Sequence, residues 1–157
     1  SRERYVEIAD RLCERGWFGQ KTGRGFYLYE EGLRTGIEDP EVLAIIAGER
    51  SAKGIRASEY SPEEIIRRYL GAMVNEAAKV LEEKVARCPS DIDVVQHYGY
   101  GFPRYRGGPL KYADMYGIRK IVEDIEEFSA EDPFFWNPSE LLKTMAAQGQ
   151  TFEDLNQ

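Results

Sequence analysis

The sequence predicts a mainly α-helical protein, and three observations carry this prediction. Apolar residues recur every three or four positions in several segments, most clearly in SPEEIIRRYLGAMVNEAAKVLEEKVAR over 61–87. This period places apolar side chains on one face of a helix. Capping residues and prolines stand at the starts of such segments, and no alternating apolar–polar pattern is long enough for a sheet. The 157 residues suit one domain or two small helical units.

The composition argues against several functional classes. Hydrophobic residues make up 42% and charged residues 31%, as in soluble globular proteins, and the formal net charge is −7. Because nucleic-acid binding requires clustered positive charge, we expect no nucleic-acid partner. No apolar run approaches the roughly 20 residues of a membrane-spanning helix. Cys13 and Cys88 lack metal-ligand spacing and His97 is the only histidine, so we expect reduced thiols and no metal site.

The N-terminal third of the chain predicts two short helices around a glycine-rich turn. A helix is expected over 2–15, and a glycine ends it. Four glycines follow within ten residues, where they allow left-handed backbone turns. The aromatic segment FYLY over 26–29 is typical of a short strand. A second helix opens at Asp39-Pro40, and residues 51–60, which lack strong periodicity, are expected to form a linker.

The segment 61–87 is expected to form the longest helix and to organise the core. Ser61 is its N-cap, Pro62 follows where a missing N–H costs nothing, and Glu64 completes a capping box. The residues expected to face the core are Ile65, Ile66, Tyr69, Leu70, Met73, Val74, Ala77, Leu81 and Val85. The residues expected on the opposite, solvent-facing side are Arg67, Arg68, Glu76, Lys79, Glu82 and Glu83.

Four shorter helices are expected after a break at Cys88-Pro89. Ser90 caps the first of them, and a structured loop follows over 98–108. The other three helices are expected over 109–116, 118–128 and 137–149. The acidic residues at 123–127 are expected to form a solvated helix face.

Two basic stretches are the candidate binding sites. Lys21 and Arg24 lie among glycines, a composition that can hold a phosphate, but the stretch is neither a Walker loop nor a dinucleotide fingerprint. Arg104 and Arg106 alternate with aromatic residues, which can stack on an adenine. The alternative for both is a structural turn whose aromatic side chains pack on the core. His97 has no nucleophile or paired carboxylate beside it, so we expect a capping or core histidine. We expect no catalytic and no cofactor-binding residue in this chain.

Three motifs, taken in order, resemble one known family. They are GQKTGRGFYLYE over 19–30, MVNEAAKVLEE over 73–83 and PSDIDVVQHYGYGFPRYRGGPLKYAD over 89–114. Together they resemble the C-terminal part of 3-hydroxyacyl-CoA dehydrogenases, above all the multifunctional enzymes of fatty-acid β-oxidation. The resemblance covers nearly the whole chain and implies a helical bundle of the 3-hydroxyacyl-CoA dehydrogenase C-terminal-domain type.

The resemblance also implies a division of the chain. Such enzymes carry an enoyl-CoA hydratase domain, an NAD-binding Rossmann domain and two copies of the helical domain. Residues 1–32 resemble the tail of the first copy, 33–59 a connecting segment and 60–157 the second copy. Catalytic copies carry an Asn eight residues before the Asn of the Asn-Glu-Ala segment, and counting back from Asn75 gives Arg67. Because arginine has no acceptor and cannot replace a neutral amide, the second copy is expected to be non-catalytic.

The function follows from the same resemblance. The parent protein is expected to oxidise L-3-hydroxyacyl-CoA to 3-ketoacyl-CoA with NAD and to carry hydratase activity. This chain alone is expected to be inactive, with its second copy in the place of a dimer partner. Expected partners are the rest of the parent chain, the parent's acyl-CoA substrate and, for this chain alone, a second copy in a homodimer. The expected compartment is the cytoplasm or the peroxisome. Two alternatives stay open: an independent helical interaction module and a small acyl-CoA-binding domain.

Overall fold

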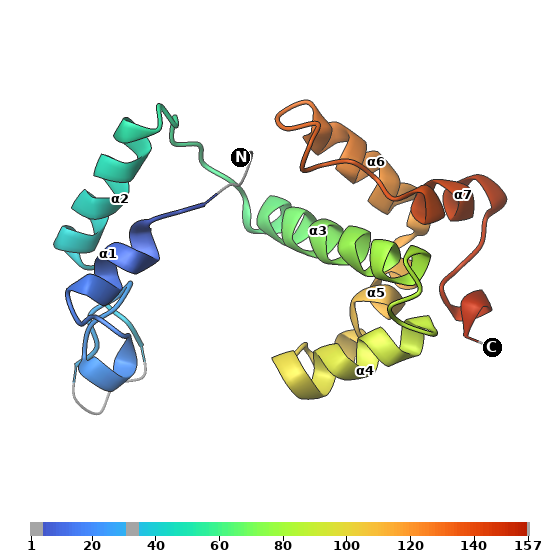
Figure 1. The fold of residues 1–157 in the computed structure, drawn as a ribbon, viewed down its shortest axis with the longest axis horizontal. Helices are drawn as coiled ribbons and strands as arrows, with labels where there is room; N and C mark the ends of the chain where they lie inside the picture. The colour runs from blue at the N-terminus through green and yellow to red at the C-terminus, as the bar shows by residue number, and fades with distance from the viewer. Residues whose placement is uncertain (1–4, 31–34, 157) are drawn as a thin grey trace. The chain divides into compact units, whose positions relative to one another are not determined.

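The computed structural model describes residues 5–30 and 35–156 and places seven α-helices in them (Figure 1). These residues contain isolated β-bridges but no strand, so the prediction of a mainly helical fold is confirmed. The prediction of a strand over 26–29 is wrong. Leu28 exchanges backbone hydrogen bonds with Ile37 at 2.9 and 2.8 Å, whereas its neighbour Tyr29 bonds back into the glycine turn. The chain forms two compact units, Ser1–Glu59 (unit 1) and Tyr60–Gln157 (unit 2).

Unit 1 is built on α1 (Ile8–Glu14) and α2 (Pro40–Ala52), which contact each other. Residues 2–4 of the first predicted helix lie outside the described residues. Leu12 of α1 and Val42 of α2 are the buried apolar side chains among the described residues of this unit. The buried Glu49 of α2 is ion-paired with Arg11 of α1 at 3.1 Å and with Lys53 at 2.6 Å. Ion pairing offsets the cost of burying this carboxylate and joins the two helices.

The glycine-rich turn is closely packed, because two of its backbone segments touch. A Cβ atom on Gly25 would lie 2.5 Å from the Cα atom of Gly19, so only glycine fits there. The 3-10 turn η1 (Gln20–Thr22) lies between them. The Thr22 hydroxyl accepts a hydrogen bond from Phe18 N at 2.9 Å and lies 2.9 Å from the carbonyl oxygen of Arg24, to which it donates. This hydrogen bonding makes the turn a structural element.

Unit 2 is a bundle organised around α3. Its elements are α3 (Pro62–Glu82), α4 (Pro89–Tyr100), η2 (Arg104–Arg106), α5 (Pro109–Tyr116), α6 (Ile118–Ser129), α7 (Glu140–Gln148) and η3 (Glu153–Leu155). Helix α3 contacts α5, α6 and α7, and Figure 1 shows it between α6 on one side and α5 on the other. The largest buried side chains of the core are Phe128, Phe152, Leu110, Ile121, Ile125, Leu142 and Met145.

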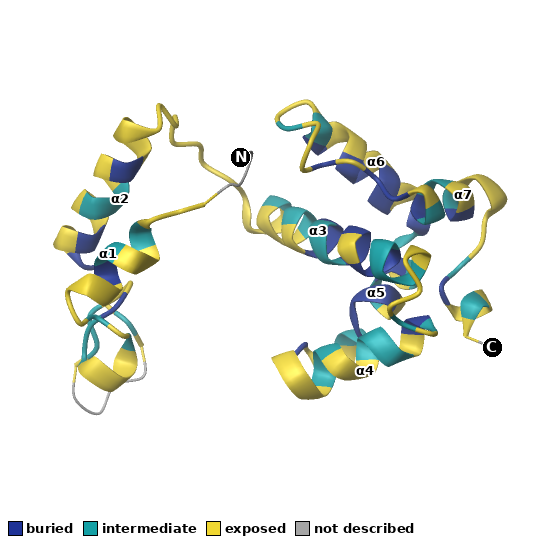
Figure 2. Cartoon of the chain, viewed as in Figure 1, coloured by how far each residue is buried: buried dark blue, intermediate teal, exposed yellow. Residues whose placement is uncertain are grey.

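The N-terminal turns of α3 do not bury the predicted apolar face. Leu70, Val74 and Ala77 are buried as predicted, but Ile65 and Tyr69 are 54% and 62% exposed. The difference arises because α6 lies against the arginine side of these turns, which leaves the apolar side uncovered. Figure 2 shows the same change in burial along α3, from an exposed start to buried residues where the helix meets α5 and α7.

Two helix ends also differ from the prediction. Helix α3 ends at Glu82 rather than continuing to residue 87, because Lys84 takes a left-handed backbone conformation with φ of 58°. Helix α4 begins at Pro89, extends through Tyr100 and ends at Gly101, where φ is 70°. Residues 98–100 are therefore helical and not part of the loop in which we expected them.

Candidate functional site

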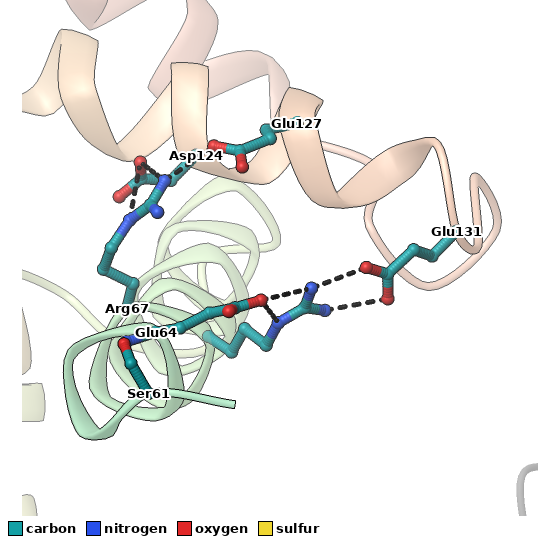
Figure 3. A network of polar contacts seen from close by, with 7 residues as sticks. Ser61, Glu64, Arg67, Asp124, Glu127 and Glu131 are labelled. Carbon is teal, nitrogen blue, oxygen red and sulfur yellow. Dashed lines mark hydrogen bonds and ion pairs between the residues drawn. The ribbon is translucent and has the colours of Figure 1, made fainter. Parts of the chain in front are cut away.

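Arg67, near the start of α3, is ion-paired with the acidic side of α6. Its Nη2 atom lies 2.5 Å from Asp124 Oδ1 and 2.7 Å from Glu127 Oε2 (Figure 3). The buried Asp124 also accepts a hydrogen bond from the Tyr116 hydroxyl at 3.0 Å. Hydrogen bonds from Arg67 to Asp124 and then to Glu127 raise the pKa of the guanidinium. The prediction that Arg67 and Asp124 face solvent is therefore wrong.

Arg68 makes a parallel bridge. Its Nη2 atom lies 2.9 Å from Glu64 Oε1 and 2.6 Å from Glu131 Oε1. The guanidinium carbon of Arg68 lies 4.3 Å from the centroid of the buried Phe128 ring, and that of Arg67 lies 5.2 Å from it. We call Glu64, Arg67, Arg68, Asp124, Glu127 and Glu131 the α3–α6 ion-pair cluster. Acidic residues at 124, 127 and 131, spaced by three and four, were the sequence signal for this contact.

Asn75 joins α3 to the start of α7. Its Oδ1 atom accepts a hydrogen bond from Ser139 N at 2.8 Å, and its Nδ2 atom donates to the Asn137 carbonyl oxygen at 2.9 Å. Asn75 is buried, 4% exposed. Ser139 in turn caps α7 by accepting from Leu142 N at 3.1 Å, so α7 starts at Glu140 and not at residue 137. Each amide atom of Asn75 thus satisfies a backbone group of the connection into α7.

The basic residues of the glycine turn are in unit 1. Arg24 Nε lies 2.6 Å from Asp39 Oδ2, and the Arg24 guanidinium carbon lies 3.7 Å from the centroid of the Trp17 ring. The hydrogen bond from Arg24 lowers the pKa of Asp39 below its ordinary value. Lys21 is exposed, with its Nζ atom 5.2 Å from the centroid of the Phe18 ring. Arg24 is therefore engaged within unit 1, whereas Lys21 is open to solvent.

The second basic stretch is in unit 2 and lies among exposed tyrosines. The guanidinium carbon of Arg104 lies 5.6 Å from the centroid of the Tyr98 ring, and that of Arg106 lies 5.4 Å from the centroid of Tyr105. Tyr100, Tyr105 and Arg106 line one cavity of about 290 Å³ together with apolar residues of α3. We call Tyr98, Tyr100, Arg104, Tyr105 and Arg106 the Tyr–Arg face.

A larger apolar cavity of about 660 Å³ lies between α3 and α4. Met73, Ala77 and Val80 line it from α3, and Ile92 and Val95 line it from α4. Gln96 and Tyr100 belong to both cavities, so the two form neighbouring parts of one α3–α4 groove. A groove lined mostly by apolar side chains is suited to an apolar ligand or to another protein element.

His97 and Asp93 support the loop after α4. His97 Nδ1 lies 3.1 Å from the Phe102 carbonyl oxygen. Asp93 accepts hydrogen bonds from Leu110 N at 2.9 Å and Lys111 N at 3.0 Å, which cap α5. Burial raises the pKa of Asp93, while these two hydrogen bonds oppose that shift. Both side chains are therefore bound to neighbouring backbone.

Comparison with known proteins identifies the family. The sequence model of the family described as "3-hydroxyacyl-CoA dehydrogenase, C-terminal domain" matches residues 65–154, which is more than half of the chain. The chain belongs to this family. The matched segment contains α4 to α7 and most of α3, so the 3-hydroxyacyl-CoA dehydrogenase C-terminal domain coincides closely with unit 2.

Curated relatives extend the similarity over both units. The chain is 42% identical over 149 residues to a peroxisomal bifunctional enzyme of Danio rerio and 40% identical over 149 residues to that of Homo sapiens. It is 36% identical over 143 residues to a fatty acid oxidation complex subunit alpha of Shewanella amazonensis. These matches cover 93%, 93% and 91% of this chain. The chain spans only 21%, 21% and 20% of the respective relatives' lengths.

Two further features are absent from residues 5–30 and 35–156. No helix there is long and apolar enough to cross a membrane. Nor do these residues bring three or more His, Cys, Asp or Glu side chains together in a way that could hold a metal ion.

Proposed function

We propose that this chain is part of a multifunctional fatty-acid oxidation enzyme. The parent protein oxidises L-3-hydroxyacyl-CoA to 3-ketoacyl-CoA with NAD and also carries enoyl-CoA hydratase activity. The family match and the names of the relatives support this proposal. The parent acts in the peroxisome or, in a prokaryote, in the cytoplasm.

Within that parent, unit 2 is a non-catalytic copy of the helical domain that supports the catalytic copy as a dimer partner would. One observation carries this part of the proposal. Arg67, which stands where the resemblance places a catalytic Asn, is held by Asp124 and Glu127. A guanidinium fixed by two carboxylates neither accepts a hydrogen bond nor is free to turn toward a substrate. Residues 1–32 are then the tail of the first copy, and 33–59 are the connection.

NADH formation from L-3-hydroxyacyl-CoA tests both parts of the proposal. The full-length parent is expected to form NADH, whereas the isolated chain is expected to form none above a heat-killed control. Turnover by the isolated chain contradicts the non-catalytic role, and an inactive, folded parent contradicts the dehydrogenase assignment.

An independent helical interaction module is the second candidate. The exposed tyrosines of unit 2 and the α3–α4 groove favour it, because both are features of protein-binding surfaces. Binding to a separate protein by a full-length parent that has no dehydrogenase activity would favour this alternative.

A further inference from the structure

The Tyr–Arg face has the composition of an interface centre. Tyr98, Tyr100 and Tyr105 are 79%, 78% and 81% exposed. Tyrosine and arginine are enriched among residues that dominate binding energy, because each gives a large contact area and a directed polar group. Tyr98 lies against Arg104, and Tyr100 and Tyr105 line one cavity with Arg106. These exposed tyrosines and arginines form a surface suited to a protein partner.

The charge of this face determines the kind of partner. Among the other arginines of unit 2, Arg67, Arg68 and Arg87 are ion-paired with carboxylates. Arg119 donates to the Ala146 carbonyl oxygen. Arg104 and Arg106 lie instead against tyrosine rings, and neither has a carboxylate partner among the described residues. In a chain with a net charge of −7, this is a local basic surface. Electrostatic complementarity therefore favours a surface that presents carboxylates.

The cavity of about 290 Å³ beside Arg106 adds an anchor position. Ile66 and Leu70 of α3 and Phe102 and Pro103 of the following loop form its apolar walls. A single bulky apolar side chain fits a pocket of this kind, and hot-spot residues commonly occupy such pockets. A carboxylate next to that side chain would then reach the Arg106 guanidinium, which lines the same cavity.

We propose that the Tyr–Arg face docks a carboxylate-bearing surface of the remaining parent chain, with one apolar side chain of that surface in the cavity. The chain spans 21% of the Danio rerio relative, so most of a parent of that length lies outside it. This inference rests on the proposed function, since it requires such a parent. The inference adds to the proposed function the surface through which unit 2 docks and the chemistry of the docking partner.

Tyrosine nitration followed by mass spectrometry tests the docking. In the isolated chain all three tyrosines are expected to react. In the full-length parent they are expected to react about tenfold more slowly, because a docked surface excludes reagent and water. Urea-unfolded parent is the reactivity control. Equal rates in the folded parent and the isolated chain would overturn the proposal.

Charge variants of the full-length parent test the partner's chemistry. Arg104→Glu with Arg106→Glu is expected to restore nitration, whereas the matched pair Arg119→Glu with Lys120→Glu, on α6, is expected to leave protection unchanged. The variant Arg104→Lys with Arg106→Lys keeps the charge and permits carbodiimide cross-linking of the amines to carboxylates. Cross-links are expected to Asp or Glu outside the 157 residues. Cross-links to carboxylates within them would overturn the proposal.

Two further outcomes distinguish this inference from its alternatives. Protection of the tyrosines in the isolated chain by free CoA, abolished by the same charge reversal, would overturn docking in favour of a phosphate site. NADH formation is a separate readout. A parent that forms no NADH but protects its tyrosines would contradict the proposed dehydrogenase activity and support the docking face. A parent that forms NADH but leaves its tyrosines reactive would support the dehydrogenase activity and contradict the docking face.

Discussion

Arg67 and Asp124 join α3 to α6 through an ion pair of 2.5 Å between residues 57 positions apart in the sequence. The Asp124 side chain is 10% exposed and that of Arg67 is 31% exposed. Because a buried carboxylate without a partner is strongly disfavoured, the pair constrains how α3 and α6 cross. Phe128 lies beneath both Arg67 and Arg68 and fills the apolar part of the same contact.

Replacing Arg67 by methionine is expected to destabilise unit 2 by roughly 1–3 kcal/mol, since Asp124 loses its charged partner in a largely buried place. Urea unfolding monitored by circular dichroism measures this free energy. The double variant Arg67→Met with Asp124→Leu is expected to recover part of the loss, because it removes the unpaired carboxylate. Arg119→Met is the control. A loss below about 0.5 kcal/mol for Arg67→Met, the range of ordinary surface substitutions, would contradict a structural role.

The substitution Arg67→Asn addresses catalysis separately. In the full-length parent it is expected to leave the dehydrogenase kcat within about a factor of two, because in the proposed non-catalytic copy Arg67 contacts no transition-state group. The assay is run well below the unfolding temperature of the variant, so that its lower stability does not reduce the folded fraction. A tenfold or larger loss of kcat in folded protein would argue that unit 2 takes part in the reaction.

Local sequence signals predicted the starts of α2, α3 and α5. Helices α1 and α7 begin later than predicted, and Cys88 rather than Ser90 stands at the N-cap of α4. Ser61 accepts from Glu64 N at 3.2 Å as its capping position implies, and α5 begins at a proline as expected. The face of α3 that is buried was not predictable in the same way. Its first turns carry both apolar residues and arginines, and only the position of α6 decides which side is covered. That position is set by tertiary contacts, among them the Arg67–Asp124 pair and the packing of α6 on α5 and α7.

The candidate site was predictable only in part. Arg24 and Arg106 looked alike in sequence, since each lies among glycines or aromatic residues. They differ because Asp39 reaches Arg24 across 15 residues, while Arg106 lies against tyrosine rings. No local pattern distinguishes an arginine with a distant carboxylate partner from one without.

Gly108 and Gly117 form a matched pair for a test of packing around Asp93. Both have positive φ, at 111° and 107°. A Cβ atom on Gly108 would lie 2.2 Å from Asp93 Cγ, whereas one on Gly117 would meet nothing within 4 Å. Gly117→Ala is expected to cost about 1–3 kcal/mol through backbone strain alone. Gly108→Ala is expected to cost at least about 1 kcal/mol more, because Asp93 must leave the start of α5. Thermal unfolding that ranks the two variants equally would contradict this account.

Acid is expected to destabilise unit 1. The hydrogen bond from Arg24 lowers the pKa of Asp39, and the one from Lys53 lowers that of Glu49. Folded pKa values below the unfolded ones, about 3.9 for Asp and 4.3 for Glu, mean that the stabilisation is complete above those values. It is lost as the pH falls through the folded pKa values. NMR amide signals of α1 and α2 followed from neutral pH into this acid range measure the loss.

Asp39→Asn keeps a capping side chain at the start of α2 but removes one titrating group. Its unit 1 is expected to be less stable at neutral pH and to show a shallower dependence on acid. An acid transition of unchanged steepness in this variant would show that the Arg24–Asp39 pair does not contribute to it.

The isolated chain is expected to self-associate through unit 1. Phe18, Phe26 and Tyr27 are 52%, 51% and 49% exposed, and with Trp17 they line a cavity of about 570 Å³. Apolar surface gathered in this way rarely stays in contact with water on a monomer, because its burial gains free energy in proportion to the area covered. Sedimentation from micromolar to near-millimolar protein is expected to show a homodimer or concentration-dependent association. Phe26→Ser is expected to weaken it, while Ile55→Ser, at a residue of similar exposure in the same unit, leaves it unchanged. A monomer at every concentration, with stability unaltered by Phe26→Ser, would mean that these aromatic side chains have no partner in a second copy.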